Sequence, residues 1–225
     1  ELATQLFSAA QLICAVDEEQ MQRFEQLCQP DVALLSDMGP EKKPDIRIVG
    51  SLKLNAFSTP VDETFADQLR VAAGSRPIVL AASTHSPEEQ ILLKASQEVV
   101  RAGYPHLLII APRHSDRSQD IARLMPQAAH RSKNQLPLLG DNHFLADSFG
   151  EMSSLVTAAD IVILGGSFVP KGGHNPLEIA ALSKPLITGP SQFKNKVEFD
   201  TLQQYGQCIT VKDGATLVKQ LTSWL

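Results

Sequence analysis

The sequence has 225 residues, of which 43% are hydrophobic and 20% are charged, and its formal net charge is −5. This length allows one large domain, or one domain with part of another. The composition is typical of a globular core and not of a disordered chain. The negative charge argues against a protein that binds nucleic acid. No apolar run reaches the roughly 18 residues of a membrane span, so we expect this chain by itself to be soluble.

The cysteines and histidines give no sign of a metal site. Cys14, Cys28 and Cys208 are odd in number and far apart, and none has a partner at a metal-ligand spacing. We expect reduced, mostly buried thiols, as in a cytosolic protein. The six histidines also lack the spacing of known zinc motifs. We therefore predict neither a metal nor a cofactor.

The first quarter of the chain predicts one strand–helix–strand unit. Apolar runs predict strands over 12–16 and 46–50, and between them Asp17 caps a helix that runs to about Cys28. Residues from about 51 to 76 predict a connector that carries one short amphipathic helix over 62–73.

From residue 77 onward, apolar runs and helical periodicities alternate regularly. The helix after the first run has a predicted capping box, with Ser86 at the cap, Pro87 at the first helical position and Glu89 closing the box. Strands that are apolar along their whole length and alternate with helices predict an α/β fold, with a parallel sheet covered by helices on both faces. The predicted strands span 78–82, 107–111, 136–139, 144–146, 161–164, 185–188 and 208–212, and the predicted helices span 86–103, 115–125, 150–158, a segment from 175, 195–204 and a segment after 213.

In such a sheet, ligands bind beyond the carboxyl ends of the strands. Polar and glycine residues follow several of the predicted strands, which indicates that they meet at one edge. The candidate site residues are Ser83, Thr84, His85, Pro112, Arg113, His114, Gly150, Glu151, Met152, Gly166, Ser167, Lys171, Gly173, His174, Asn175, Pro176, Leu177 and Glu178.

The glycine-rich stretch after the 161–164 strand suits a nucleotide. The adjacent Gly172 and Gly173 let the backbone approach a ligand closely, and the helix that follows offers free amides to a phosphate. Glu178 is placed to accept hydrogen bonds from ribose hydroxyls, and Lys171 to meet phosphate. The alternative is that Asn175 and Glu178 form only a capping box and that Lys171 only solvates the loop.

Arg113 directly follows a buried strand, and its guanidinium suits a phosphate or a sugar carboxylate because it can bind two oxygens at once. The alternative is a surface arginine paired with Asp116 or with a helix end. Glu151 either belongs to the site or only favours a helix N-terminus. The three candidate histidines are either ligand contacts or structural hydrogen-bond donors.

Several of these segments resemble the 3-deoxy-D-manno-octulosonic acid (Kdo) transferases. The resemblance is carried by Ala81–His85 with Glu88 and Glu89, by Pro112–His114, by Gly150–Met152, and above all by the sequence GGSFVPKGGHNPLE from Gly165 to Glu178. Segments 17–24 and 50–53 resemble the end of that family's N-terminal domain, except that Ser51 stands where Asn is expected.

The resemblance implies a GT-B fold, in which two Rossmann-like domains face each other. Residues 1–55 would be a remnant of the N-terminal acceptor domain with its linker, and residues 56–225 the C-terminal CMP-Kdo-binding domain. Pro112–His114, Gly150–Met152 and Gly173–Glu178 would contact CMP. Supporting contacts would come from Ser83, Thr84, His85, Gly166, Ser167 and Lys171.

The family transfers Kdo from CMP-Kdo to lipid A precursor (lipid IVA), with inversion, in lipopolysaccharide synthesis at the cytoplasmic face of the bacterial inner membrane. Its general base lies in the N-terminal domain. The sequence begins at Glu1 without a methionine, and we expect further residues ahead of it and a further helix after Leu225. We therefore expect a fragment that binds donor but is inactive alone. The alternatives are a GT-B transferase or epimerase that uses a UDP-sugar, and a non-catalytic nucleotide-binding or interaction module.

Overall fold

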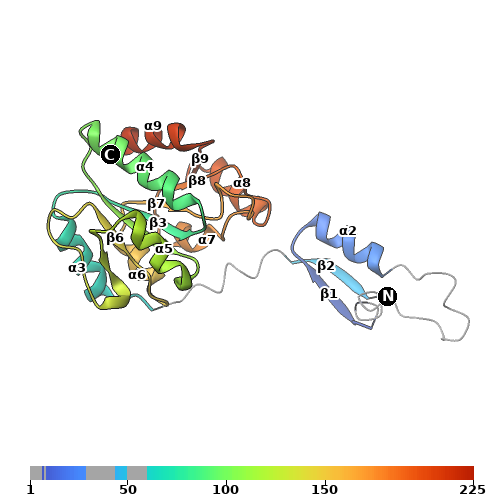
Figure 1. The fold of residues 1–225 in the computed structure, drawn as a ribbon. Coiled ribbons are helices and arrows are strands. Elements are labelled where there is room, and N and C mark those ends of the chain that lie inside the picture. The colour runs from blue at the N-terminus through green and yellow to red at the C-terminus, as the bar shows by residue number, and fades with distance from the viewer. Residues whose placement is uncertain (1–6, 8, 29–43, 50–59) are drawn as a thin grey trace, which may run out of the picture. The chain divides into compact units, whose positions relative to one another are not determined.

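The computed structural model of the chain describes residues 7, 9–28, 44–49 and 60–225. The chain divides into two compact units, Glu1–Ala56 and Phe57–Leu225 (Figure 1). The expected division into a remnant over 1–55 and a donor-binding domain over 56–225 stays a prediction. The expected motif over 50–53 and the first part of the expected connector, 51–59, lie outside the described residues, whereas the helix expected over 62–73 is confirmed as Glu63–Ala73.

The described part of the first unit is a small strand–helix–strand motif. It consists of β1 (Leu12–Ala15), α2 (Glu18–Leu27) and β2 (Asp45–Ile48), and the two strands pair in parallel. Asp17 caps α2 as predicted, because its carboxylate accepts a hydrogen bond from the backbone N–H of Gln20 at 2.8 Å.

The second unit is built on one seven-stranded sheet in which every pairing is parallel, with the strand order β5-β6-β4-β3-β7-β8-β9. The predicted α/β class is therefore confirmed. Its elements in chain order are α3 (Glu63–Ala73), β3 (Ile78–Thr84), α4 (Glu88–Arg101), β4 (Leu107–Pro112), η2 (Ser115–Arg117), α5 (Ser118–Leu124), β5 (Ala129–His130), η3 (Arg131–Lys133), β6 (His143–Leu145), α6 (Met152–Ala158), β7 (Ile161–Leu164), α7 (Leu177–Ala181), β8 (Leu186–Thr188), α8 (Lys196–Gln204), β9 (Cys208–Thr210) and α9 (Gly214–Trp224).

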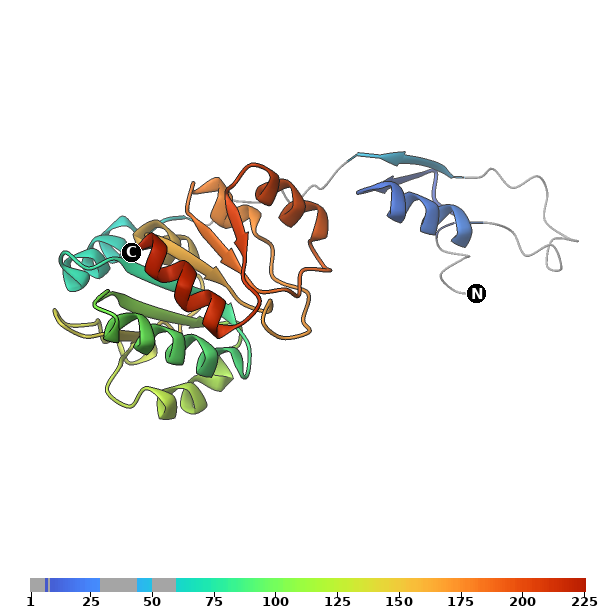
Figure 2. The ribbon, with the colours of Figure 1, turned by 90° about the horizontal axis from the view of Figure 1, so that it is seen from above.

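The inner strands β3, β4, β7 and β8 of the sheet bury both of their faces. In β3, Ile78, Leu80 and Ala82 pack into the core shared with α3, α6, α7 and α8. The residues between them, Val79 and Ala81, pack into the core shared with α4, α5 and α9. Figures 1 and 2 show α4 and α9 side by side along the sheet. Burial on both faces explains why the strands are continuously apolar in sequence, and each fully buried Leu or Ile contributes about 1.5–3 kcal/mol to stability.

The strand order reverses beside β3. The chain proceeds outward from β3 through β4 to β5 at the edge, places β6 between β4 and β5, and then returns to form β7 on the other side of β3. The loops that follow the adjacent strands β3 and β7 therefore lead to opposite sides of this point in the sheet. In open parallel sheets this switch point is where ligands bind, beyond the carboxyl ends of the strands.

The predicted strand over 136–139 is wrong. Leu138 and Leu139 are 73% and 77% exposed, and the carboxylate of Asp141 accepts a hydrogen bond from the backbone N–H of Leu138, which closes a turn. The edge position is taken by the two-residue strand β5. Such a short edge strand leaves no apolar run to detect.

The predicted capping box at the start of α4 is also wrong. Pro87 is the N-cap residue and makes no side-chain cap hydrogen bond, while Ser86 is exposed. Glu88 and Glu89 are fully buried, at 0% and 1% exposure. Both carboxylates point inward to partners in the site described below.

The three cysteines are free thiols, as expected, although Cys14 is exposed while Cys28 and Cys208 are buried. Burial raises the pKa of Cys208 to about 12, so this thiol stays protonated and unreactive at neutral pH. Within the described residues, no helix is long and apolar enough to cross a membrane.

The close approach of β3 and β7 generates the first testable prediction. A Cβ at Gly165 would lie 2.4 Å from the carbonyl oxygen of Ser83, so an alanine there forces the two strand ends apart. Gly165→Ala should lower the free energy of unfolding by about 1–3 kcal/mol, measured by urea denaturation. Gly214→Ala is the control, since its Cβ would meet only Ile91, at 3.4 Å. An unchanged unfolding midpoint for Gly165→Ala would contradict the packing described here.

Candidate functional site at the carboxyl edge of the sheet

A single buried carboxylate joins the two turns at the switch point. The Oε2 atom of Glu88 accepts hydrogen bonds from the backbone N–H groups of His85 and Gly166, both at 2.8 Å. Its Oε1 atom accepts from Ser167 at 3.0 Å and Phe168 at 2.9 Å. Four backbone donors satisfy the charge, which is what a fully buried carboxylate requires. The turn after β3 and the turn after β7 are therefore fixed to each other.

Glu89, the next residue, anchors the same turn to η2. Its two oxygens accept hydrogen bonds from the guanidinium of Arg117 at 2.8 and 2.9 Å, and Oε1 also accepts from the Thr84 hydroxyl at 2.7 Å. Burial alone would raise the pKa of Glu89, but the hydrogen bonds from Arg117 and Thr84 outweigh it and hold the pKa below its ordinary value. The pair is thus an ionised, bidentate bridge.

Two of the predicted supporting residues are engaged inside the protein. The Thr84 hydroxyl is fully buried against Glu89. The Ser167 hydroxyl is also fully buried, where it donates to the carbonyl of Leu164 and accepts from the backbone N–H of Gly189. Any support that these two residues give to a ligand is therefore indirect, through the loops that they hold.

Three histidines from separate loops gather at the carboxyl edge. The Nε2 atoms of His85 and His174 are 2.9 Å apart, and their rings stack with centroids 5.1 Å apart. The ring of His114 meets that of His85 edge-on, at 5.7 Å between centroids. The sequence placed these residues at the same edge, and the structure brings their side chains into contact.

The same edge carries an excess of positive charge. Burial, followed by the nearby charges of His85, Arg113, Lys194 and His114, lowers the pKa of His174 to about 4. Burial, His114, Lys171 and Arg117 likewise lower the pKa of His85, against a smaller opposing effect of Glu89. Residues after β4, after β7 and after β8 thus act on one another electrostatically across the edge.

Arg113 is an unpaired cation at this edge. Its backbone N–H donates to the carbonyl of Thr84 at 3.1 Å, while its side chain is exposed. Among the described residues no carboxylate forms an ion pair with it, so the alternative pairing with Asp116 is not formed. The guanidinium is therefore open to an anionic ligand.

The loop before α7 depends on its two glycines. Gly172 and Gly173 have φ angles of +86° and +69°, and a Cβ on Gly173 would lie 2.9 Å from the ring of Phe199. The alternative capping box is not formed, because the Asn175 side chain accepts only from the backbone N–H of Leu177, at 3.1 Å. Since α7 has only five residues, its dipole contributes less to anion binding than we expected from the sequence.

The turn over 150–152 meets the start of α7 at a small hollow. Met152 and Glu178 both line this hollow of about 180 Å³, together with Val61. Glu151 caps nothing, because its carboxylate is paired with the guanidinium of Arg131 at 3.0 Å. It thereby holds the turn in place.

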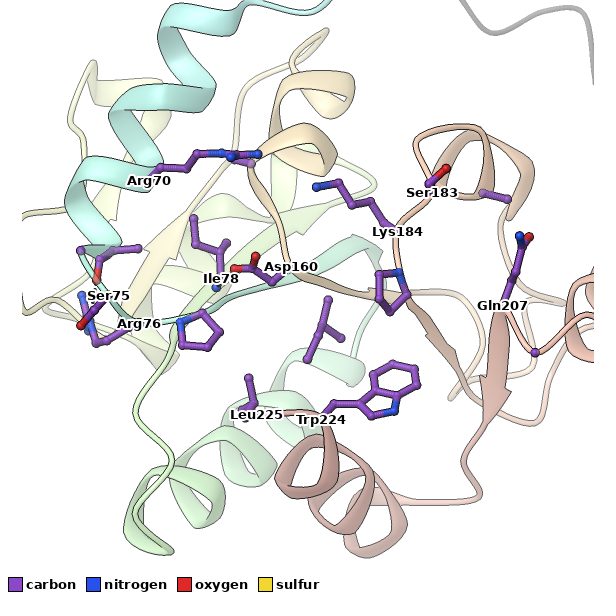
Figure 3. A pocket seen from close by; sticks show the side chains of 18 residues that line it. Arg70, Ser75, Arg76, Ile78, Asp160, Ser183, Lys184, Gln207, Trp224 and Leu225 are labelled. Atoms are coloured by element: carbon purple, nitrogen blue, oxygen red, sulfur yellow. Dashed lines mark hydrogen bonds between the residues drawn. The ribbon is translucent and has the colours of Figure 1, made fainter.

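A larger hollow lies at the amino ends of the strands, where β3, β7 and β8 begin. Its volume is about 940 Å³, and Arg70, Asp160, Lys184 and Trp224 lie around it (Figure 3). Its charged side chains bond to the backbone: Arg70 and Lys184 both donate to the carbonyl of Thr157, at 2.6 and 2.9 Å, and Asp160 accepts from the backbone N–H of Ile78 at 2.8 Å. We therefore place the candidate site at the carboxyl edge, where the cations are not engaged.

The sequence reasoning missed three contributors to this site. Glu88 was interpreted only as part of a helix start, although it stands in the segment that carries the family resemblance. Arg117 and Lys194 were not selected, because neither directly follows a strand. No group of three or more metal-ligating side chains occurs in the part of the chain that the structure describes.

The Glu88 bridge generates the second testable prediction. In Glu88→Gln the amide nitrogen replaces one acceptor oxygen and faces two backbone N–H groups, which lose their partner. The free energy of unfolding should fall by at least about 2 kcal/mol in urea denaturation. Glu98→Gln, on the exposed side of the same helix, should change it by less than about 0.5 kcal/mol. Equal effects of the two substitutions would refute the structural role of Glu88.

No protein-family model matches the chain. Curated proteins do: it is 36% identical over 194 residues to the 3-deoxy-D-manno-octulosonic acid transferase of Haemophilus influenzae, covering 84% of this chain and 42% of that protein. The namesake from Rickettsia conorii is 32% identical over 178 residues, covering 77% of this chain and 38% of that protein. The namesake from Aquifex aeolicus is 33% identical over 147 residues, covering 65% and 41%.

A solved structure supports the same relationship. The crystal structure of the C-terminal CMP-Kdo binding domain of WaaA from Acinetobacter baumannii matches with a TM-score of 0.61 and 28% identity, covering 72% of this chain and 94% of that one. The expected fold class, one Rossmann-like half of a GT-B glycosyltransferase, is confirmed. This chain spans less than half the length of the curated relatives named above. It belongs to the family of 3-deoxy-D-manno-octulosonic acid transferases.

Proposed function

We propose that residues 57–225 bind CMP-Kdo, the sugar donor of a Kdo transferase. The observation that carries the proposal is the convergence of Arg113, His174 and the loop before α7 at the switch point, where the Arg113 guanidinium forms no ion pair with a carboxylate of the described residues. The related Acinetobacter domain, described as CMP-Kdo binding, supports the same donor. CMP-Kdo carries a phosphodiester, and an unpaired arginine beside glycine-rich backbone suits that group.

The proposed position of the nucleoside follows from the small hollow beside α6. Glu178 is exposed at its rim and can accept hydrogen bonds from the two ribose hydroxyls, while Met152 offers an apolar surface to the base. Pro112, His114, Gly150, Glu151, Gly173, Asn175, Pro176 and Leu177 remain proposed donor contacts on the segments around it. Glu151 contributes through its ion pair with Arg131, which fixes the turn.

In the proposed reaction, the acceptor hydroxyl of lipid A precursor (lipid IVA) displaces CMP at the anomeric carbon with inversion. A carboxylate of the N-terminal domain removes the hydroxyl proton. The residues of this chain stabilise the charge that develops on the leaving phosphate, and the guanidinium of Arg113 makes the main electrostatic contribution. We therefore propose donor binding, and no transfer, for this chain alone. The whole transferase would work in lipopolysaccharide synthesis at the cytoplasmic face of the bacterial inner membrane.

The nucleotide preference is the third prediction. Calorimetric titration of the 225-residue chain with CMP, UMP and UDP should give the lowest Kd for CMP. Tighter binding of UDP would overturn the proposal in favour of an enzyme that uses a UDP-sugar. Binding of none of the three would indicate an interaction module.

The role of Arg113 is the fourth prediction. Arg113→Ala should weaken CMP binding by about 10- to 100-fold, because a hydrogen bond to a charged group contributes about 1.5–3 kcal/mol. The matched control is Arg123→Ala, which removes an exposed arginine of α5 paired with Asp120 and should leave the Kd unchanged. If both variants bind CMP like the wild type, Arg113 is not a donor contact.

A further inference from the structure

The carboxyl edge has more positive charge than one phosphodiester neutralises. Arg113, Lys171 and Lys194 are exposed there. The two buried acids at this edge are already engaged, since Glu89 pairs with Arg117 and Glu88 with four backbone N–H groups. On the proposed donor a sugar carboxylate is attached to the same carbon as the phosphate, so two anions would enter together.

The two stacked histidines lie within this positive edge and share one hydrogen bond. In a neutral pair, one Nε2 carries a proton and donates it to the bare Nε2 of the other ring, at 2.9 Å. The donating imidazole then has a bare Nδ1. Within the described residues this nitrogen has no hydrogen-bond partner on either ring, so a further proton can be added there without breaking the pair.

The free protein resists adding that proton. The groups that face the two rings are His114, Arg113, Arg117, Lys171, Lys194 and the single acid Glu89. Burial and this cationic surrounding keep both rings neutral, and the pKa of His174 is about 4. An anion seated among the same cations reverses the sign of the local field and favours the imidazolium.

We propose that the His85–His174 pair takes up one proton when an anionic group of the donor binds beside it, which couples donor affinity to pH. This inference rests on the proposed donor-binding function. The anionic group is a phosphodiester oxygen or the sugar carboxylate, since both present the same chemistry to an imidazolium. The added Nδ1–H donates to the anion, and the shared Nε2 hydrogen bond holds the two rings in place.

The direction of the pH effect follows from linkage. An adjacent opposite charge raises a histidine pKa by about 1–3, so the pKa of His174, which is about 4 in the free protein, should rise toward the neutral range when the anion is bound. Between the free and bound values, affinity rises as pH falls, by up to about tenfold per pH unit. Below both values the dependence ends, because both states are protonated.

The test is calorimetric titration of the 225-residue chain with CMP-Kdo between pH 5.5 and 7.5, repeated in buffers of different ionisation enthalpy. The dependence of the apparent enthalpy on the buffer gives the number of protons taken up. We expect uptake that increases toward pH 5.5 and a Kd that falls in parallel.

A second arm of the experiment uses cytidine 5′-(methyl phosphate), which has the phosphodiester but no carboxylate. Uptake in both arms assigns the proton to the phosphodiester, and uptake with CMP-Kdo alone assigns it to the carboxylate.

The variant series separates the pair from other histidines. His174→Gln keeps a hydrogen-bonding side chain that does not titrate, and it should abolish the uptake and flatten the pH dependence. His143→Gln is the control: His143 begins β6, at the opposite edge of the sheet, and should leave the uptake unchanged. CMP-Kdo binding without proton uptake by the wild type overturns this inference and leaves the proposed function intact. Absence of CMP-Kdo binding overturns both.

Discussion

The arrangement of the carboxyl edge depends on the carboxylate of Glu88. A charged group with no exposure to solvent is strongly destabilising unless hydrogen bonds replace its hydration, and here four backbone N–H groups do so. Two of its donors, Gly166 and His85, adjoin the two strands on either side of the switch point. These hydrogen bonds therefore do more than replace the hydration of the carboxylate, because they also fix the distance between the two loops that carry the paired histidines.

The central sheet could be predicted because its strands are buried on both faces. β3, β4 and β7 carry uninterrupted apolar runs, which few other structures produce. The prediction failed at the edge of the sheet, where β5 has only two residues and where the apolar Leu138 and Leu139 are exposed in a turn. Which residues form such a short edge strand depends on the neighbouring strand with which they pair, and the local sequence carries no signal of that pairing.

The location of the candidate site was predictable from a rule of topology, whereas its internal bonds were not. His85 and His174 are 89 residues apart, and Arg131 and Glu151 are 20 apart, so no local pattern connects them. Glu89 illustrates the opposite difficulty, since its spacing from Ser86 fits a capping box, although its carboxylate bonds to Arg117. Whether a glutamate at this spacing caps a helix or forms an ion pair is decided by the residues that the tertiary fold places beside it.

A ligand could bind at either end of the parallel strands, at their amino ends or at their carboxyl ends. The central claim is that the nucleotide binds at the carboxyl ends. The most direct measurement is the mapping of backbone amide chemical shifts in the 225-residue chain during titration with CMP. The account predicts the largest shifts at Arg113, at Met152 and over His174–Glu178. Shifts concentrated instead at Arg70, Lys184 and Trp224, around the 940 Å³ hollow, would contradict it.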